Sequence, residues 1–320
     1  MNNFFEHAKP LSSNNIEVRN TIYHYTSPQG LIGILGSENP KLFFTQYDSL
    51  NDLKERKDVL DFLYGYCEYR VKENLMPKEL EEEIRKIELS DKSRIEHNLD
   101  KIIWLDDGEK YCCKTEMKNE DCYTYICSFS REPDLLPMWR MYSKSEHYEG
   151  YCLGLRSEDF KIRTSFGRGY KIELRNVVYT DSDKTAILDK LLIPIMQHYN
   201  EYSIQDKLLV IEIIKQSIFN YQFVFKNKAF EYEKEIRAIL HVPKNLNSTL
   251  VNLSERKYRT VNGMIVPYVE YEIPHANLLS VNLAPSLKEE TNKNNLTDFL
   301  VSKKYDNVKV YGSEIPLRVN

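Results

Sequence analysis

The sequence has no apolar run close to the roughly 20 residues that a membrane-spanning helix needs. Its first seven residues lack the basic head and the apolar stretch of a signal peptide. Glycine and proline are few, with 11 and 12 residues, which excludes collagen-like chains and chains dominated by linkers. We therefore expect a soluble, cytoplasmic protein with no membrane partner.

The motifs of several large enzyme classes are missing as well. The chain has no GxGxxG, no GxxxxGKS/T, no HExxH and no GxSxG. These absences argue against a Rossmann dinucleotide site, a P-loop, a simple zinc protease and the nucleophile elbow of α/β-hydrolases. The sequence also lacks a CxxC pair, so we expect no metal site and reduced thiols in the core or in loops. The six cysteines are Cys67, Cys112, Cys113, Cys122, Cys127 and Cys152.

Acidic and basic residues are nearly equal in number. Lysine and arginine number 44 and aspartate and glutamate 48, so the formal charge is 44 − 48 = −4. This balance argues against a protein that wraps nucleic acid by electrostatics alone. The hydrophobic share of 42% is enough for a core and excludes global disorder. Tyrosine is common, with 23 residues against 13 phenylalanines, and suits both ligand-lined clefts and half-buried strands.

The local patterns predict an α+β fold with a mixed or antiparallel sheet core of short strands and two helical blocks. Strands are predicted near residues 22–26, 42–45, 125–130, 151–155, 172–179, 235–240, 266–271, 278–283 and 308–311. Helices are predicted near residues 28–35, 55–75, 78–104, 138–142 and 184–225, the last divided near 202–203. We predict a single domain, 1–320, with helical insertions near 55–104 and 184–228. Residues 106–122 are predicted to form an irregular loop.

The first candidate for chemistry is the aromatic strand that contains His24 and Tyr25. A histidine in such a strand is either a hydrogen-bonded core residue or a donor to a sugar or phosphate. A second candidate combines Ser128 and Ser130, which alternation places on one face of a strand, with Trp139 and Tyr142. The serines could bond a ligand or neighbouring backbone. The two rings, three residues apart, could pack in the core or support a flat ring.

A third candidate is the pair Glu233 and Glu235, which share a strand face if the strand extends that far. Two like charges this close raise each other's pKa, so their burial would need a reason. One interpretation is a solvent-facing edge. The other is a pair of carboxylates that face a sugar hydroxyl or a developing cation.

Three weaker signals remain open. Asn51 and Asp52 with Glu55 form a turn and helix cap or could hold a metal. The basic stretch Lys161–Arg175 with its aromatic residues could contact nucleic acid or form a surface hairpin. Glu255–Lys257 has the ExK spacing of some metal nucleases, which also occurs by chance.

Taken in order, these segments resemble a large bacterial family of unknown function. The resemblance covers residues 22–318 and depends on the order of the blocks rather than on any one of them. Its blocks are Tyr23–Thr26 with Leu31 and Leu35, Asn51 and Asp52 with Glu55, Cys127–Ser130 with Trp139, Tyr142 and Gly150, Lys226 with Phe230, Glu233, Glu235 and Arg237, and Ser313–Arg318. One departure is Ala284 before Pro285, where the family pattern has glycine.

The same residues are distantly similar to ADP-ribosyltransferases. That resemblance implies NAD as substrate, with His24 on a ribose or phosphate oxygen and Tyr142 or Trp139 stacked on nicotinamide. Glu235 would engage the 2′-hydroxyl of the ribose, and Glu233 would orient an acceptor. Tyr25, Ser128 and Ser130 would complete the binding site, with Ser128 bracing the pocket or Glu235.

The resemblance therefore implies an NAD-dependent ADP-ribosyltransferase-like enzyme or an NAD glycohydrolase. Such an enzyme could be a defence or toxin-type effector that modifies nucleic acid or protein. Two alternatives stay open. The chain could be a non-catalytic binding module for a nucleotide or nucleic acid, or a metal-dependent nuclease that uses Asp52, Glu55, Glu233 and Glu235.

Overall fold

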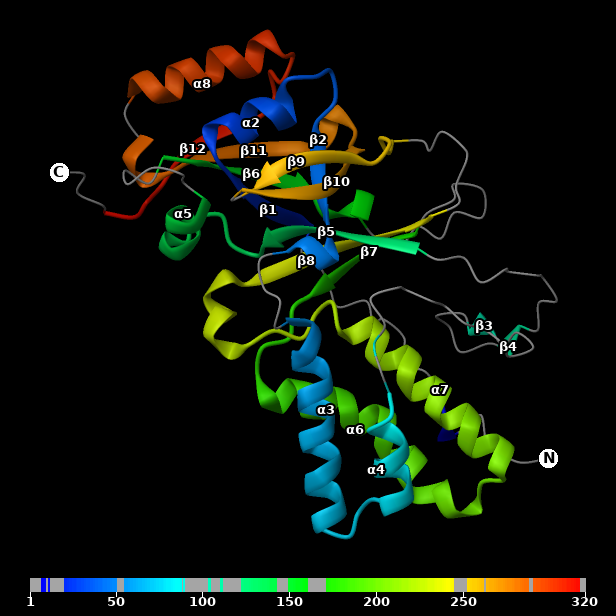
Figure 1. Cartoon of the computed structure of the whole chain (residues 1–320). Helices are drawn as coiled ribbons and strands as arrows, with labels where there is room; N and C mark the ends of the chain where they lie inside the picture. Colours follow the sequence, from blue (N-terminus) through cyan, green and yellow to red (C-terminus); the bar gives the residue numbers. More distant parts are fainter. Residues whose placement is uncertain are drawn as a thin grey trace. The chain divides into compact units, whose positions relative to one another are not determined.

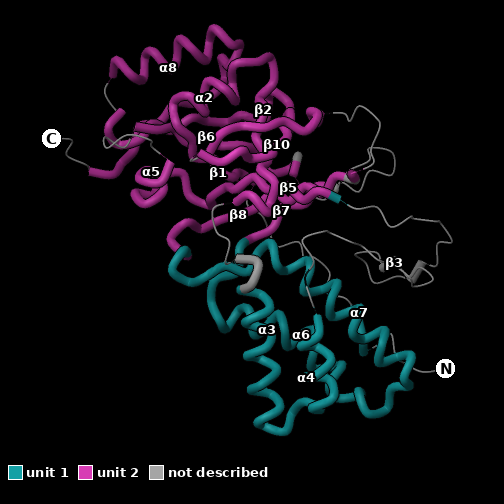
Figure 2. Tube along the Cα trace, in the orientation of Figure 1, with its two compact units in different colours: residues 1–14, 51–122, 177–230 teal, residues 15–50, 123–176, 231–320 magenta. Residues whose placement is uncertain are grey.

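The chain divides into two compact units, each made of three segments (Figure 2). Unit 1 comprises residues 1–14, 51–122 and 177–230, and unit 2 comprises 15–50, 123–176 and 231–320. The computed structural model describes residues 7–9, 11, 20–50, 55–87, 89, 103–104, 110–111, 122–142, 149–160, 171–244, 252–261, 263–287 and 290–316. The predicted helical insertions fall in unit 1, and the single-domain assignment stays a prediction.

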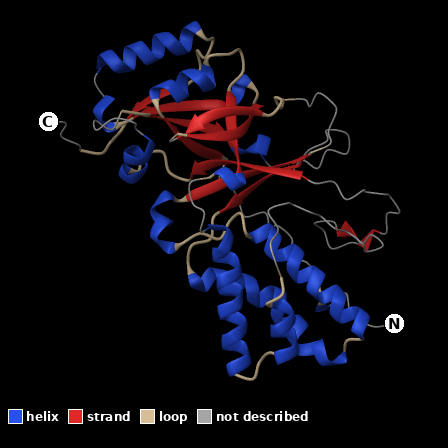
Figure 3. Cartoon of the chain, in the orientation of Figure 1, coloured by secondary structure: helices blue, strands red, loops and turns tan. Residues whose placement is uncertain are grey.

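Unit 2 is built on a sheet that has ten strands within the described ranges (Figures 1 and 3). They are β1 (Thr21–Thr26), β2 (Lys41–Gln46), β5 (Cys122–Ser130), β6 (Tyr151–Arg156), β7 (Lys171–Asn176), β8 (Glu235–Pro243), β9 (Lys257–Val261), β10 (Met264–Glu272), β11 (Leu278–Leu283) and β12 (Lys309–Gly312). The order is β12-β11-β6-β1-β5-β2-β10-β9, and β8 pairs with both β5 and β7. The known registers are antiparallel except for the parallel pair β11 and β12. The predicted α+β class with a mixed, mainly antiparallel sheet is confirmed.

Alternation along the strands separates an apolar face of the sheet from a polar one. On β8 the core side chains are Ile236, Ala238 and Leu240, whereas Glu235 and Arg237 point to the other face. The helices α2 (Pro28–Leu35) and α8 (Glu290–Ser302) bury leucine and isoleucine side chains in the same core. A smaller apolar cluster joins α5 (Leu136–Tyr142) to β1 and β6. The carboxylates of β8 are thus fixed on a face that the large core does not fill.

The middle of β5 lies between two strand pairings. Ser130 pairs with Tyr23 of β1, whereas Tyr125 and Ile126 pair with β2. The Ser128 carbonyl between these pairings is bonded instead by the His24 side chain, whose Nδ1 lies 3.0 Å from it. The His24 side chain thereby supplies a hydrogen bond to a carbonyl of β5 that lies between the pairings with β1 and β2.

Unit 1 contains the helices of the two predicted blocks. They are α3 (Glu55–Lys72), α4 (Lys78–Ile84), α6 (Asp181–His198) and α7 (Ile204–Tyr221). Tyr66 and Arg70 on α3 both donate hydrogen bonds to the Asp189 carboxylate on α6, at 2.6 and 2.5 Å. None of the helices in the described part of the chain combines the length and the apolar character that crossing a bilayer requires.

The predicted division of the second helical block has a local cause. Ser203 is the N-cap of α7, where its hydroxyl accepts from the Asp206 amide and the Asp206 carboxylate accepts from the Ser203 amide. This capping box satisfies two amide groups that the first turn of a helix leaves without partners.

We expect Ser203→Ala to lower the free energy of unfolding by about 1 kcal/mol because it removes this cap. Urea titration followed by circular dichroism would measure the change, since α7 is one of the long helices. Ser302→Ala at the end of α8 is the control, because that hydroxyl caps no helix N-terminus. An equal loss in both variants would contradict the role of the capping box.

Two predicted segments differ from the structure. The helix predicted for residues 78–104 ends at Ile84, and Ile103–Trp104 (β3) forms a short antiparallel pair with Lys110–Tyr111 (β4) in the stretch predicted as loop. A dense run of charged helix-forming residues was the only signal for that longer helix, and charge without an apolar stripe is a weak predictor of helix length. Residues 88 and 90–102 lie outside the described residues. The strand β9 and the helix α8 were not predicted.

Candidate functional site

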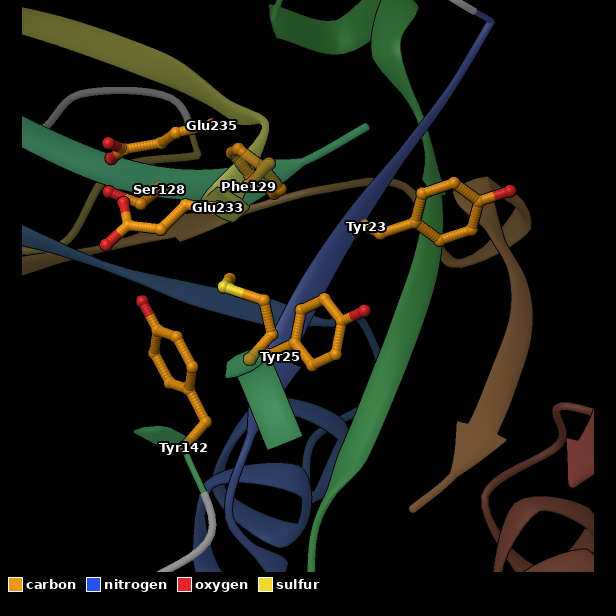
Figure 4. Close-up of a pocket in the computed structure, with 8 residues that line it drawn as sticks. Tyr23, Tyr25, Ser128, Phe129, Tyr142, Glu233 and Glu235 are labelled. Atoms are coloured by element: carbon orange, nitrogen blue, oxygen red, sulfur yellow. The ribbon is translucent and has the colours of Figure 1, made fainter. Parts of the chain in front are cut away.

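A small pocket lies on the polar face of the sheet in unit 2 (Figure 4). Its walls come from β1, β5, α5 and the segment that enters β8. They are formed by Tyr23, Tyr25, Ser128, Phe129, Met138, Tyr142, Glu233 and Glu235. The pocket measures about 230 Å³ with its open mouth included, and about one water molecule fits inside it.

Two buried carboxylates form one wall of this pocket. Glu233 ends the 3₁₀ helix Lys228–Glu233 (η4), Glu235 begins β8, and each is 4% exposed. The Glu235 carboxylate accepts two hydrogen bonds from the Arg237 guanidinium, from Nε at 2.8 Å and from Nη2 at 3.1 Å. This bidentate geometry fixes the carboxylate beside a cation in a site that excludes most water.

Tyr142 faces the two carboxylates from the end of α5. Figure 4 shows its hydroxyl directed toward Glu233 and Glu235. Burial raises the pKa of Tyr142, and the negative charges of Glu235 and Glu233 raise it further. The phenol therefore stays protonated at neutral pH and can donate one hydrogen bond in the pocket.

Tyr25 contributes only its ring to the pocket. Its hydroxyl points away from the carboxylates (Figure 4), donates to the Glu132 carbonyl at 3.0 Å and accepts from the Leu135 amide at 2.9 Å. Trp139 packs edge to face against Tyr25, with 4.7 Å between ring centres, and its Nε1 donates to Asp134 at 2.6 Å. The Trp139 ring is thus part of the apolar support and does not line the pocket.

The two predicted serines lie on one face of β5 but have different environments. Ser128 lines the pocket. Ser130 is fully buried, where its hydroxyl donates to the Glu233 carbonyl at 2.8 Å and accepts from the Glu132 amide at 3.2 Å. Ser130 therefore holds the backbone of Glu233 in place from behind the pocket.

His24 lies apart from the pocket residues. Adjacent strand residues point to opposite faces, so His24 cannot share a face with Tyr23 and Tyr25, which line the pocket. Its Nδ1 faces the Ser128 carbonyl, which can only accept, so Nδ1 carries the proton. Burial lowers the pKa of His24, which keeps the imidazole neutral with Nε2 as an acceptor.

The structure therefore brings together five predicted residues in one pocket and separates three from it. Its lining includes Tyr25, Ser128, Tyr142, Glu233 and Glu235. His24, Ser130 and Trp139 support the pocket or lie beside it. The expected site combined an imidazole, two hydroxyls, an indole or a phenol, and a carboxylate. Strand alternation removes His24 from this set, and buried hydrogen bonds keep Ser130 and Trp139 out of the lining.

Sequence reasoning gave no role to Arg237, although a signal was present. Residues two apart on a strand share a face, so the spacing of Glu235 and Arg237 predicts the ion pair that the structure contains. Met138 and Phe129 also line the pocket without having been predicted. Nothing in their local pattern distinguishes them from core residues.

Most of the weaker candidates fall outside the part of the chain that the structure describes. Asn51 and Asp52, the Glu55 side chain and residues 161–170 lie outside the described residues. Arg175, at the end of the predicted basic stretch, is 6% exposed and is therefore not on a basic surface. Within the described ranges, no three histidine, cysteine, aspartate or glutamate side chains are arranged to hold a metal ion.

The buried thiols of Cys67 and Cys127 do not resemble nucleophiles. Burial raises the pKa of Cys67 and of Cys127 to about 12, so both are protonated at neutral pH. Cys112 and Cys113 lie outside the described residues.

No curated protein and no solved structure matches the chain. Residues 138–238 match the model of the family described as Protein of unknown function (DUF2971). This range contains Tyr142, Glu233, Glu235 and Arg237, and within it the predicted resemblance to a family of unknown function is confirmed.

Proposed function

We propose that the protein is an NAD-dependent ADP-ribosyltransferase-like enzyme whose pocket receives the nicotinamide ribose of NAD. One observation favours this function over a binding module or a nuclease. The side chains of Ser128, Tyr142, Glu233 and Glu235 come from three distant segments and line one pocket beside a buried arginine. Such a set offers an aromatic ring, hydroxyl groups and fixed negative charge to a sugar that becomes cationic.

The reaction breaks the bond between ribose C1′ and the nicotinamide nitrogen. The electron pair of that bond leaves with nicotinamide, and positive charge develops on the ribose ring. Glu235 accepts a hydrogen bond from the 2′-hydroxyl and stabilises this charge as it forms. Arg237 holds the carboxylate in place through two hydrogen bonds, to both of its oxygens.

Glu233 and Tyr142 complete the step. Glu233 orients the acceptor hydroxyl and takes its proton while the acceptor oxygen bonds to C1′. When water is the acceptor, the same step is NAD hydrolysis. Tyr142 lies against the leaving nicotinamide, and Ser128 donates to the ribose. Because the pocket now has room for about one water molecule, Tyr142 or Met138 must move aside to admit the substrate.

We further propose that the enzyme is a cytoplasmic effector that transfers ADP-ribose to a nucleic acid or a protein. Its test is to incubate purified protein with NAD, alone and with RNA, DNA or a protein mixture, and to measure released nicotinamide. We expect release in at least one condition, unaffected by a metal chelator. NAD binding without release would favour the non-catalytic module, and chelator-sensitive cleavage of nucleic acid would favour the nuclease.

A further inference from the structure

Arg259 on β9 is a half-buried cation that lacks a carboxylate partner among the described residues. Its Nη2 donates to the Thr45 hydroxyl at 2.8 Å, and its guanidinium lies over the rings of Phe43 and Tyr268, 5.4 and 5.2 Å from their centres. Burial lowers the pKa of Arg259, which means that its surroundings disfavour the charge. Arginine stays protonated in proteins, so an anion at this position would relieve that cost.

Two other cations of unit 2 have a carboxylate partner. Lys257, two residues earlier on the same strand, is 2.9 Å from the Glu270 carboxylate. Arg237 is paired with Glu235. Among the described residues, the charge of Arg259 is contacted instead by a hydroxyl and two rings.

The strand registers place Arg259 on the same side of the sheet as the pocket. Thr45 is directly opposite Ile126 of β5, and directly opposed residues share a face. Ser128 follows Ile126 by two residues and therefore lies on that face too. From strand spacings, the Cα atoms of Thr45 and Ser128 are roughly 8 Å apart.

We propose that Arg259 binds a phosphate group of the dinucleotide whose nicotinamide ribose occupies the pocket beside Ser128. This inference rests on the proposed function for the identity of the ligand. In NAD the pyrophosphate follows the ribose by one methylene group, which suits a guanidinium bonded to Thr45 of β2, the strand next to β5. The Nε of Arg259 is buried without a partner, so the phosphate is bound by the two terminal nitrogens.

Arg256 provides a matched control. Its guanidinium also lies over aromatic rings, 4.2 Å from the Tyr123 centre and 5.5 Å from the Tyr258 centre, and it donates to Gln46 rather than to a carboxylate. Gln46 follows Thr45 on β2 and therefore faces the other side of the sheet. Arg256 thus has the same kind of partners as Arg259 without access to the pocket face.

The test measures binding of inorganic pyrophosphate and of ADP-ribose by calorimetry, and turnover of NAD in parallel. We expect Arg259→Gln to weaken both ligands by roughly 10- to 100-fold, as the loss of a charged hydrogen bond implies. Arg259→Lys, which keeps the charge, should lose less, and Arg256→Gln should bind as the wild type does. In turnover, Arg259→Gln should raise KM and leave kcat nearly unchanged. Thermal unfolding of each variant shows that it is folded.

Each result has a defined meaning. Failure of the wild type to bind pyrophosphate, or equal losses in the Arg259 and Arg256 variants, would overturn the phosphate site. Binding that depends on Arg259 without any NAD turnover would sustain the phosphate site and reject the proposed reaction. A short oligonucleotide that binds through Arg259 while ADP-ribose does not would assign the phosphate to an acceptor strand and overturn the dinucleotide assignment.

Discussion

Replacing Arg237 with methionine is expected to lower the free energy of unfolding of unit 2 by about 3–5 kcal/mol. The Arg237 and Glu235 side chains are 3% and 5% exposed, and their two hydrogen bonds compensate for the removal of both charges from water. Removing the arginine alone leaves a buried carboxylate without its cation. The cost is therefore far larger than that of breaking an ion pair on the surface.

The measurement can be made specific to unit 2. The chain has two tryptophans, so a Trp104→Phe background leaves Trp139 of unit 2 as the fluorescent probe of urea unfolding. Lys257→Met, which breaks the more exposed pair with Glu270 in the same unit, should change stability by no more than about 1 kcal/mol. The double change Arg237→Met with Glu235→Leu should recover much of the loss. A loss below about 1 kcal/mol for Arg237→Met would show that the pair is not buried as described.

Replacing Glu235 with glutamine is expected to reduce nicotinamide release by roughly 100- to 1,000-fold, the usual cost of removing a group that stabilises transition-state charge. Glutamine keeps the size of the side chain and one acceptor oxygen, but it removes the negative charge that the developing ribose cation needs. The loss should appear in kcat more than in KM, because the charge exists only in the transition state.

Glu231→Gln is the matched control for this variant. Glu231 lies in η4, two residues before Glu233, and is half-buried but does not line the pocket. It should keep wild-type activity. Because Glu235→Gln also disturbs the pair with Arg237, its urea unfolding and its NAD affinity must be measured beside the rate. A folded Glu235→Gln protein that binds NAD and releases nicotinamide at the wild-type rate would exclude the proposed role of Glu235.

The sequence predicts much of the local structure because local structure depends on nearby residues. Alternation identifies β1, β5 and β8, and it correctly places Ser128 with Ser130 on one face and Glu235 opposite Ile236. The division before α7 follows from a serine with an aspartate three residues later.

The arrangement of the site depends on contacts that no local pattern contains. The sequence pattern does not distinguish Trp139 from Tyr142. In the structure the Trp139 indole donates to Asp134 and packs beside the pocket, whereas the Tyr142 phenol faces Glu233. His24 is a different case, because its separation from Tyr25 follows from alternation alone and was predictable. The strand order that brings β8 beside β5 joins segments about a hundred residues apart, and their pairing depends on burial of the whole sheet.

The most direct test is a crystal structure of the Glu235→Gln variant soaked with NAD. We predict that Tyr142 or Met138 turns aside, that the nicotinamide ribose lies beside residues 233 and 235, and that the nicotinamide lies against the Tyr142 ring. One phosphate should lie within hydrogen-bond distance of the Arg259 terminal nitrogens. NAD bound on another surface while the pocket keeps its present shape would contradict the account.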